Sequence, residues 1–257
     1  MMFGFYRAEM LKLRHTKMFW AAWVPAILCN LYSLLMLLPK MSMSGETVTF
    51  NLNEVFYRQG NIITIFGPFI FALVTAYVLS REYSERTINQ LFTYPVSRVR
   101  IFTAKLGVIF TITVVASLLS CISAIFMGLA KALAGDIPFD LILSGIVMNL
   151  STCLFAFGTI PVAAAVSIVS KNVIAPMVLG ATCSFITLIL ELGHTMKSVL
   201  FPWATPYYLV RNFGEGFAET GENPYIGTAI VLLLLTFLIS LAFCLWHYSK
   251  AEVHSGS

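Results

Sequence analysis

The sequence contains few charged residues. Only 11% of its 257 residues are Asp, Glu, Lys or Arg, whereas 58% are hydrophobic. A soluble domain carries about 25% charged residues, because charge has to cover a water-facing surface. This shortage excludes a soluble globular protein and indicates one integral membrane domain comprising residues 1–257.

Residues for catalysis and metal binding are also scarce. The five cysteines lie in apolar stretches without a C-x-x-C pair, which favours buried thiols over disulfides or a metal site. Neither H-E-x-x-H nor G-x-S-x-G is present. We therefore expect no catalytic residue, no metal and no cofactor bound by this chain. The net charge of +4 is explained by loop charges that set membrane orientation, so we expect no nucleic acid partner.

Six apolar runs are long enough to cross a bilayer. Apart from Glu191 near the end of the fifth run, they contain no Asp, Glu, Lys, Arg or His. A charge in mid-membrane costs roughly 2.5–3.5 kcal/mol and usually serves ion or proton handling. Its absence argues against a proton- or sodium-coupled carrier, a voltage sensor or a charged ion pore. Pro161 in the fourth run predicts a kink or a tilt. The predicted spans are residues 18–38, 62–79, 106–129, 141–169, 173–192 and 225–246.

The distribution of Lys and Arg predicts the orientation. If both termini face the cytosol, 11 of the 16 basic residues lie on the cytosolic side. The positive-inside rule therefore favours a multi-pass protein of the cell membrane with both termini in the cytosol.

Two further segments are predicted to lie at the membrane surface. In residues 1–17, Phe3, Tyr6, Met10 and Leu13 fall on one helical face, which predicts an amphipathic interfacial helix. The alternative is a basic tail that only sets topology. Residues 199–210 are too short to cross and are broken by prolines, which favours a re-entrant or interfacial element over a plain surface loop.

The segment 81–105, REYSERTINQLFTYPVSRVRIFTAK, is the most informative part of the sequence. It interrupts two apolar runs, falls on the predicted cytosolic side, and is much longer than a turn requires. Such a segment can form a small helix on the cytosolic face for a partner to move. It combines a charged cluster, an apolar set and a proline stop: Arg81, Glu82, Glu85 and Arg86; Ile88, Leu91 and Phe92; and Pro95.

Together these features resemble the permease subunits of type-2 ATP-binding-cassette (ABC) transporters. The most specific local match is R-E-x-x-E-R-T-I-x-x-L…P-V-S-R…K in residues 81–105. Arg86 stands where the family commonly has glycine, which leaves the shape of the turn open. The start K-L-R-x-(T/S)-K-x-(F/W), at residues 12–19, looks most like the lantibiotic-immunity and bacitracin-resistance permeases of Gram-positive bacteria. The positions that match the loop pattern of the family are Thr87, Leu91, Pro95, Ser97, Arg98 and Lys105.

The resemblance implies an all-α polytopic membrane protein with six transmembrane helices, an N-terminal interfacial helix and a re-entrant-like outer segment before the last span. It also implies a cytosolic coupling helix between the second and third spans that docks onto a separate ATPase subunit, on which ATP and Mg²⁺ would bind. A second permease, identical or related, and membrane lipid would be further partners. The implied ATPase contacts are Arg81, Glu82, Glu85, Arg86, Thr87 and Asn89.

The expected function is therefore that of a non-enzymatic permease subunit of an ABC exporter. We expect its substrate to be amphipathic, a lantibiotic or a similar antimicrobial peptide that is cleared from the membrane. Two alternatives stay open. The first is an ABC permease for a lipid, a polysaccharide or haem. The second is a non-transporting membrane sensor or scaffold whose cytosolic loop recruits a partner.

Overall fold

The computed structural model describes residues 2–14, 27–28, 31, 52–84, 97–132, 139–193, 195–211 and 223–250. Within these ranges the secondary structure is entirely helical. The elements in chain order are α1 (Met2–Arg14), α3 (Leu52–Ser84), α5 (Arg98–Ala132), α6 (Phe139–Ser170), α7 (Ile174–Leu192), the short 3₁₀ helix η2 (Met196–Leu200), α8 (Tyr207–Arg211) and α9 (Ile226–Lys250).

Five helices in the described part of the chain are long and apolar enough to cross a membrane. They are α3, α5, α6, α7 and α9, and each coincides with one of the second to sixth predicted spans. The chain is thus a multi-pass membrane protein whose described part is helical. The first predicted span, residues 18–38, lies outside the described residues except for Ile27, Leu28 and Leu31.

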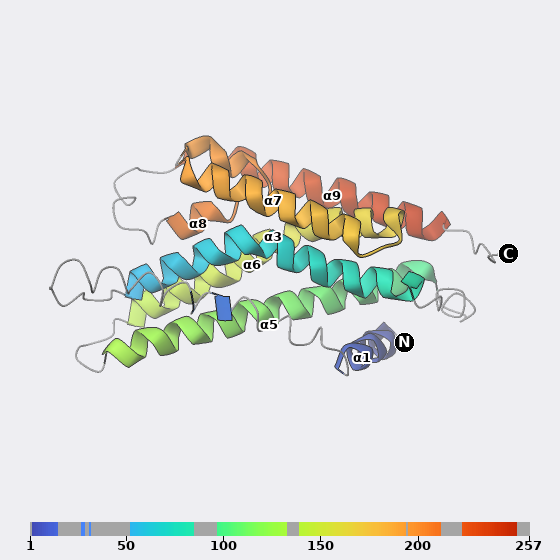
Figure 1. Ribbon diagram of the computed structural model, residues 1–257, viewed down its shortest axis with the longest axis horizontal. Helices are drawn as coiled ribbons and strands as arrows, with labels where there is room; N and C mark the ends of the chain where they lie inside the picture. Colours follow the sequence, from blue (N-terminus) through green and yellow to red (C-terminus); the bar gives the residue numbers. More distant parts are fainter. Residues whose placement is uncertain are drawn as a thin grey trace.

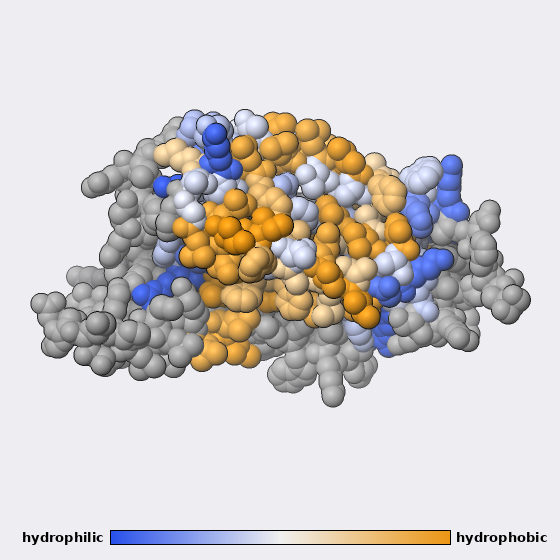
Figure 2. All heavy atoms as spheres, turned by 45° about the horizontal axis from the view of Figure 1, so that its top comes forward, coloured by the Kyte–Doolittle hydropathy of each residue, from blue (hydrophilic) through white to orange (hydrophobic). Residues whose placement is uncertain are grey.

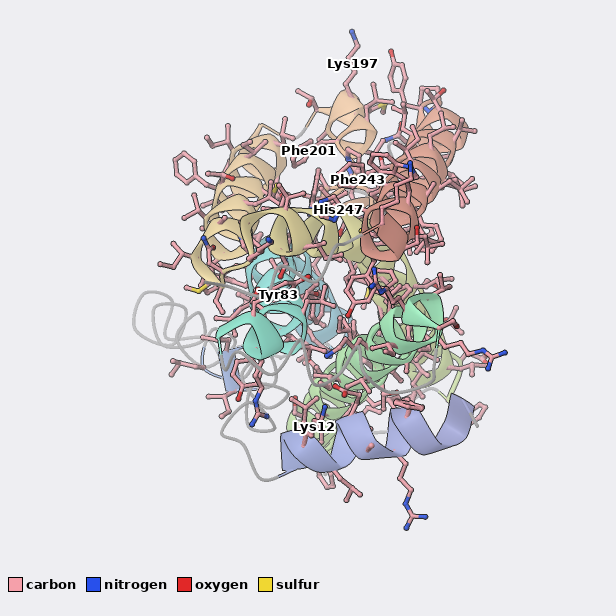
Figure 3. All side chains as sticks on the ribbon, turned by 90° about the vertical axis from the view of Figure 1, so that its right-hand side faces the viewer. Lys12, Tyr83, Lys197, Phe201, Phe243 and His247 are labelled. Atoms are coloured by element: carbon pink, nitrogen blue, oxygen red, sulfur yellow. The ribbon has the colours of Figure 1, made fainter. Side chains whose placement is uncertain are left out.

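The long helices run side by side, and α1 and the end of α9 lie at the same end of the bundle (Figure 1). We call this the α1 end, because α1 lies across it, as the view along the bundle shows (Figure 3). The end of α3, the start of α5 and the end of α9 are also found there. The opposite end carries η2 and α8 and is called the α8 end.

Helix α3 forms the centre of the bundle. In its most apolar stretch 67% of the residues are buried, compared with 17% in α9. Its Phe71, Val74 and Val78 belong to a core cluster that also contains Leu13 of α1 and Ile109 of α5. The N-terminal helix is therefore part of the packed core as well as of the surface.

Two helices extend further into polar sequence than hydropathy predicts. Helix α3 begins at Leu52 rather than near residue 62, and α5 begins at Arg98 rather than near residue 106. The added turns contain polar side chains that are nevertheless buried: Gln59 is 1% exposed and donates to Ser120 at 3.0 Å. Contacts with neighbouring helices replace water there, so a hydropathy scan begins these helices too late.

The visible face over α7 and α9 is hydrophobic across its middle and hydrophilic toward its two ends (Figure 2). Exposed residues such as Val178 and Phe185 of α7 and Leu238 and Ile239 of α9 contribute to this surface. An exposed apolar band between polar ends suits a surrounding bilayer.

Proline residues lie inside two spans without ending them. Helix α6 continues through Pro161 to Ser170, so the expected kink or tilt there stays a prediction. In α3, Pro68 is followed by Phe69, whose N–H donates to Ser184 of α7 at 3.2 Å. At the same crossing, a Cβ on Gly180 would lie 2.8 Å from the Pro68 carbonyl oxygen. Helices α3 and α7 can approach this closely only because residue 180 has no side chain.

We predict that Gly180→Leu destabilises the bundle by about 1–3 kcal/mol or more, because the added atoms meet backbone at this crossing. Thermal unfolding in detergent, followed by circular dichroism, would measure the loss. Gly227→Leu is the matched control, since a Cβ at Gly227 would have no atom within 4 Å. Equal unfolding temperatures for the two variants would contradict the close α3–α7 contact.

Candidate functional site

The predicted partner-binding segment leaves the bundle at the α1 end. Six of its predicted positions lie outside the described residues: Glu85, Arg86, Thr87, Asn89, Leu91 and Pro95. Glu82 is in the last turn of α3, but its side chain is not described. The structure describes the two helix ends that flank this segment, which we call its anchors. One is the end of α3, with Arg81, and the other is the start of α5, with Ser97, Arg98 and Lys105.

Lys105 is buried at the junction of three helices. It is only 1% exposed, and its Nζ donates to Glu9 Oε2 of α1 and to the Val78 carbonyl of α3, both at 3.2 Å. A buried ammonium group is tolerated only when it is paired and hydrogen-bonded. Lys105 thus connects the two anchor helices with each other and with α1. The sequence places Lys105 in the loop pattern, whereas the structure places it inside α5.

Glu9 completes this junction. It is 7% exposed, and its Oε1 accepts a bond from Lys12 Nζ at 2.6 Å. Burial raises the pKa of Glu9, but the charges and hydrogen bonds of Lys105 and Lys12 outweigh that effect and hold the pKa below its usual value. The carboxylate is therefore ionised at neutral pH and bridges two lysines. We call Glu9, Lys105 and the Val78 carbonyl the Lys105 clamp.

Helix α1 has further contacts with both anchors. The Tyr6 hydroxyl lies 2.7 Å from Thr111 Oγ1 of α5, and Leu13 is buried in the core. Arg81 Nη1 donates to the Lys12 carbonyl at 3.4 Å, and its guanidinium lies 5.9 Å from the centre of the Tyr77 ring. Arg81 is thus oriented by α1, and its contact with an ATPase stays a prediction.

The end of α3 is also tied to α6 and α7. The Ser80 hydroxyl lies 2.7 Å from Ser167 Oγ of α6 and donates to the Asn172 carbonyl at 2.8 Å. Lys171 adopts a φ of 52° in the tight connection between those helices. Asn172 Oδ1 then accepts the N–H of Ala175 in the first turn of α7 at 3.0 Å. Any displacement of the α3 end therefore acts on α6 and α7.

The start of α5 is held by α9. Arg98 Nη1 donates to the Ser249 carbonyl at 3.4 Å, and the rings of Phe102 and Tyr248 lie 5.5 Å apart. The Ser97 carbonyl accepts the N–H of Arg100 at 2.9 Å, which fixes the first turn of α5. Between them, the two anchors therefore contact α6, α9 and the connection to α7: the end of α3 contacts α6 and the start of α7, and the start of α5 contacts α9.

The contacts at the α1 end join α1, α3, α5, α6 and α9 to one another. No group of three His, Cys, Asp or Glu side chains that could hold a metal occurs among the described residues. Glu9 and Ser80 were not predicted as functional residues. Glu9 offered a weak signal, as an acid beside the apolar face of a basic helix, whereas Ser80 offered none.

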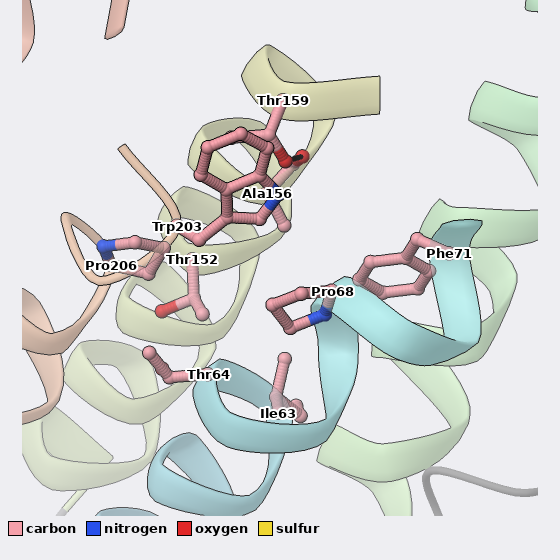
Figure 4. A pocket seen from close by; sticks show the side chains of 9 residues that line it. All are labelled: Ile63, Thr64, Pro68, Phe71, Thr152, Ala156, Thr159, Trp203 and Pro206. Carbon is pink, nitrogen blue, oxygen red and sulfur yellow. Dashed lines mark hydrogen bonds between the residues drawn. The ribbon is translucent and has the colours of Figure 1, made fainter. Parts of the chain in front are cut away.

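At the α8 end, a small cavity lies where the segment before α8 meets α3 and α6. Trp203 and Pro206 face Pro68 of α3 and Thr152 and Thr159 of α6 across it (Figure 4). Its volume of about 10 Å³ holds roughly one water molecule. This cavity is therefore too small for a peptide or lipid substrate in this conformation.

These features define a class: a multi-pass helical membrane protein whose helices are joined by buried polar contacts. The chain belongs to the ABC-2 family transporter proteins, whose family model matches residues 6–189, from α1 to the last turn of α7. It is also similar to the bacitracin transport permease protein BCRB of Bacillus licheniformis. The two are 24% identical over 194 residues, which cover 75% of this chain and 88% of that protein. The resemblance inferred from the sequence is confirmed.

We predict that Lys105→Met or Glu9→Gln alone weakens α1 docking by about 3–5 kcal/mol, because each leaves a buried polar partner without its counterpart. The double variant is expected to cost less than the sum of the two. Amide hydrogen exchange of residues 2–14, together with thermal unfolding, would complete this double-mutant cycle.

Lys12→Met provides the control, since the Lys12 side chain is 46% exposed. Its loss should cost no more than about 1 kcal/mol. Strictly additive effects of the Glu9 and Lys105 substitutions would mean that the two side chains do not act as a pair.

Proposed function

We propose that this chain is the membrane-spanning permease subunit of an ABC exporter that removes an amphipathic peptide antibiotic from the membrane. Membership of the ABC-2 family carries the transporter part of this proposal. The peptide part is supported by the similarity to a permease named for bacitracin transport. Spans with few charges also suit a substrate that is taken from the bilayer.

The proposed topology has six spans with both termini in the cytosol. Helix α1 and the start of α3 lie at opposite ends of the bundle (Figure 1). Residues 18–38 are apolar and of spanning length, and Leu28 packs against Ile62 and Ile63 of α3. These observations support a first span beside α3. The α1 end would then face the cytosol, and the η2–α8 segment would be the re-entrant-like outer element.

ATP hydrolysis would take place on a separate subunit, because the sequence contains no G-x-x-x-x-G-K-[ST] motif. That subunit would bind ATP and Mg²⁺ and contact the coupling helix through Glu82, Glu85, Arg86, Thr87 and Asn89, with Arg81 at the edge. A second permease, identical or related, would complete the transporter within the lipid.

The contacts at the α1 end support a route for the conformational change. A push on the coupling helix would reach the end of α3 and the start of α5. From α3 it would pass through Ser80 to α6 and α7, and from α5 through Phe102 to α9. The Lys105 clamp would keep α1 and both anchors moving together.

The test is resistance in a susceptible Gram-positive host that expresses this chain with its ATPase. We expect the pair to raise the inhibitory concentration of bacitracin or a lantibiotic several-fold. Glu82→Lys, Glu85→Lys or removal of the Pro95 stop should abolish this protection while leaving membrane expression and ATP hydrolysis intact. Asp140→Lys is the control, because it reverses an exposed acid at the α8 end.

If the wild-type pair gives no protection against any such peptide, the substrate assignment is wrong. Full protection in all three loop variants would instead mean that the coupling element lies elsewhere. A sensor or scaffold would bind its partner without any nucleotide-dependent change in the bundle.

A further inference from the structure

Pro68 interrupts the central helix of the bundle at its middle. It is the central residue of α3, which extends on both sides of it from Leu52 to Ser84. Because a proline has no backbone N–H, the carbonyl of Thr64, four residues earlier, lacks its usual donor within the helix. In a membrane such a carbonyl is satisfied by a neighbouring helix, a side chain or an ordered water.

The small cavity at the α8 end lies at this break. Thr64 and Pro68 both line it, and the Thr64 carbonyl points along the helix toward Pro68, so it is directed to the cavity wall (Figure 4). Helix α6 lines the cavity with two further hydroxyls, those of Thr152 and Thr159. A cavity of about 10 Å³ with several polar groups in its wall suits one water molecule.

The contacts between α3 and α6 show which α6 threonine is level with the carbonyl at the break. Toward the α8 end, a Cβ on Gly145 of α6 would meet the ring of Phe56 of α3. Toward the α1 end, the Ser80 hydroxyl lies 2.7 Å from Ser167 Oγ. The two pairs have nearly the same separation in sequence, so the helices run in the same direction in one register. This register places Thr152 level with the carbonyl.

The Thr152 hydroxyl can accept a further hydrogen bond. It donates to the Met148 carbonyl at 2.8 Å, which uses its only proton, and its oxygen keeps a lone pair for another donor. A water molecule has two protons to donate, one for this hydroxyl and one for the Thr64 carbonyl. Trp203, which also lines the cavity, carries an indole N–H that can donate to the water.

We propose that one water molecule bridges the Thr64 carbonyl of α3 and the Thr152 hydroxyl of α6, and that α3 bends at this hydrated joint. Helices kink where a proline or an inserted water interrupts the ladder of backbone hydrogen bonds. At the joint, the Phe69 N–H donates to Ser184 of α7 at 3.2 Å, so the pivot of the bend is attached to α7.

The two halves of α3 are held by different neighbours. In the half before Pro68, a Cβ on Gly60 would lie 2.5 Å from Val210, so this half packs directly against α8. In the half after Pro68, the Val78 carbonyl accepts a bond from Lys105 at 3.2 Å. A bend at the joint therefore lets the second half move with the Lys105 clamp while the first half stays with α8. That this movement serves transport rests on the proposed function.

The water is tested by radiolytic footprinting of the full-length chain in nanodiscs, because radicals formed from a bound water oxidise the side chains beside it. Phe71 lines the cavity and is 4% exposed, whereas Phe56 of the same helix lies outside this cavity and is 0% exposed. We expect Phe71 to be oxidised several-fold more than Phe56. Thr152→Val should abolish this difference. Thr159→Val is the matched control, since it makes the same change about two turns further along α6 and should keep the difference.

The bend is tested by amide hydrogen exchange around the joint. Pro68→Ala supplies the N–H that the Thr64 carbonyl lacks and thereby displaces the water. We expect exchange of residues 69–72 to slow several-fold in this variant, while exchange of α9 stays unchanged.

Each outcome decides a part of the proposal. Equal oxidation of the two phenylalanines in wild type overturns the water site, even if Thr152→Val fails to fold. Preferential oxidation of Phe71 that persists in a folded Thr152→Val variant overturns the bridge to α6. Unchanged exchange in Pro68→Ala means that α3 does not bend at this joint. If both the water and the bend are found but cells gain no resistance, the joint stands and the proposed export function is wrong.

Discussion

The buried charge of Lys105 is the constraint on which the α1 end depends. An ammonium group that is 1% exposed requires an anionic partner, and the partner is Glu9 of α1. Burial of Lys105 therefore requires α1 to pack against the start of α5, so that Glu9 lies beside it. Because Lys105 also bonds the Val78 carbonyl, the same charge joins α3 and α5, the helices that flank the predicted coupling segment. One ion pair thus links both anchors to α1.

The buried acids at the two ends of the bundle differ in their partners. At the α1 end, Glu9 has two lysine partners, and the helices are joined by polar contacts that can transmit a push. At the α8 end, Glu191 has a buried oxygen without a hydrogen-bond partner. The short helices η2 and α8 follow it in the chain, and Pro202 and Pro206 lie between them. Within the proposed transporter, the α1 end would receive force from an ATPase.

Hydropathy predicts most of the fold, because an apolar run long enough to cross a bilayer forms a transmembrane helix there. It begins α3 and α5 too late, because polar side chains such as Gln59 and Lys105 resemble loop residues in sequence although they are buried against neighbouring helices. Resemblance to a family points to Lys105 as a pattern position, but only the structure identifies its partner Glu9. The pairing spans 96 positions in the chain, and no local pattern encodes it. The predicted contacts from Glu85 to Asn89 lie outside the described residues and stay predictions.

The central claim is that this chain is moved by an ATPase on another chain. The most direct measurement is purification of the chain from its native membranes in a mild detergent, with mass spectrometry of the proteins that accompany it. The account predicts a stoichiometric ABC ATPase, and the same preparation would reveal whether a second permease is present. Recovery of the chain alone, or with a signalling protein and no ATPase, would contradict the account and favour a membrane sensor or scaffold.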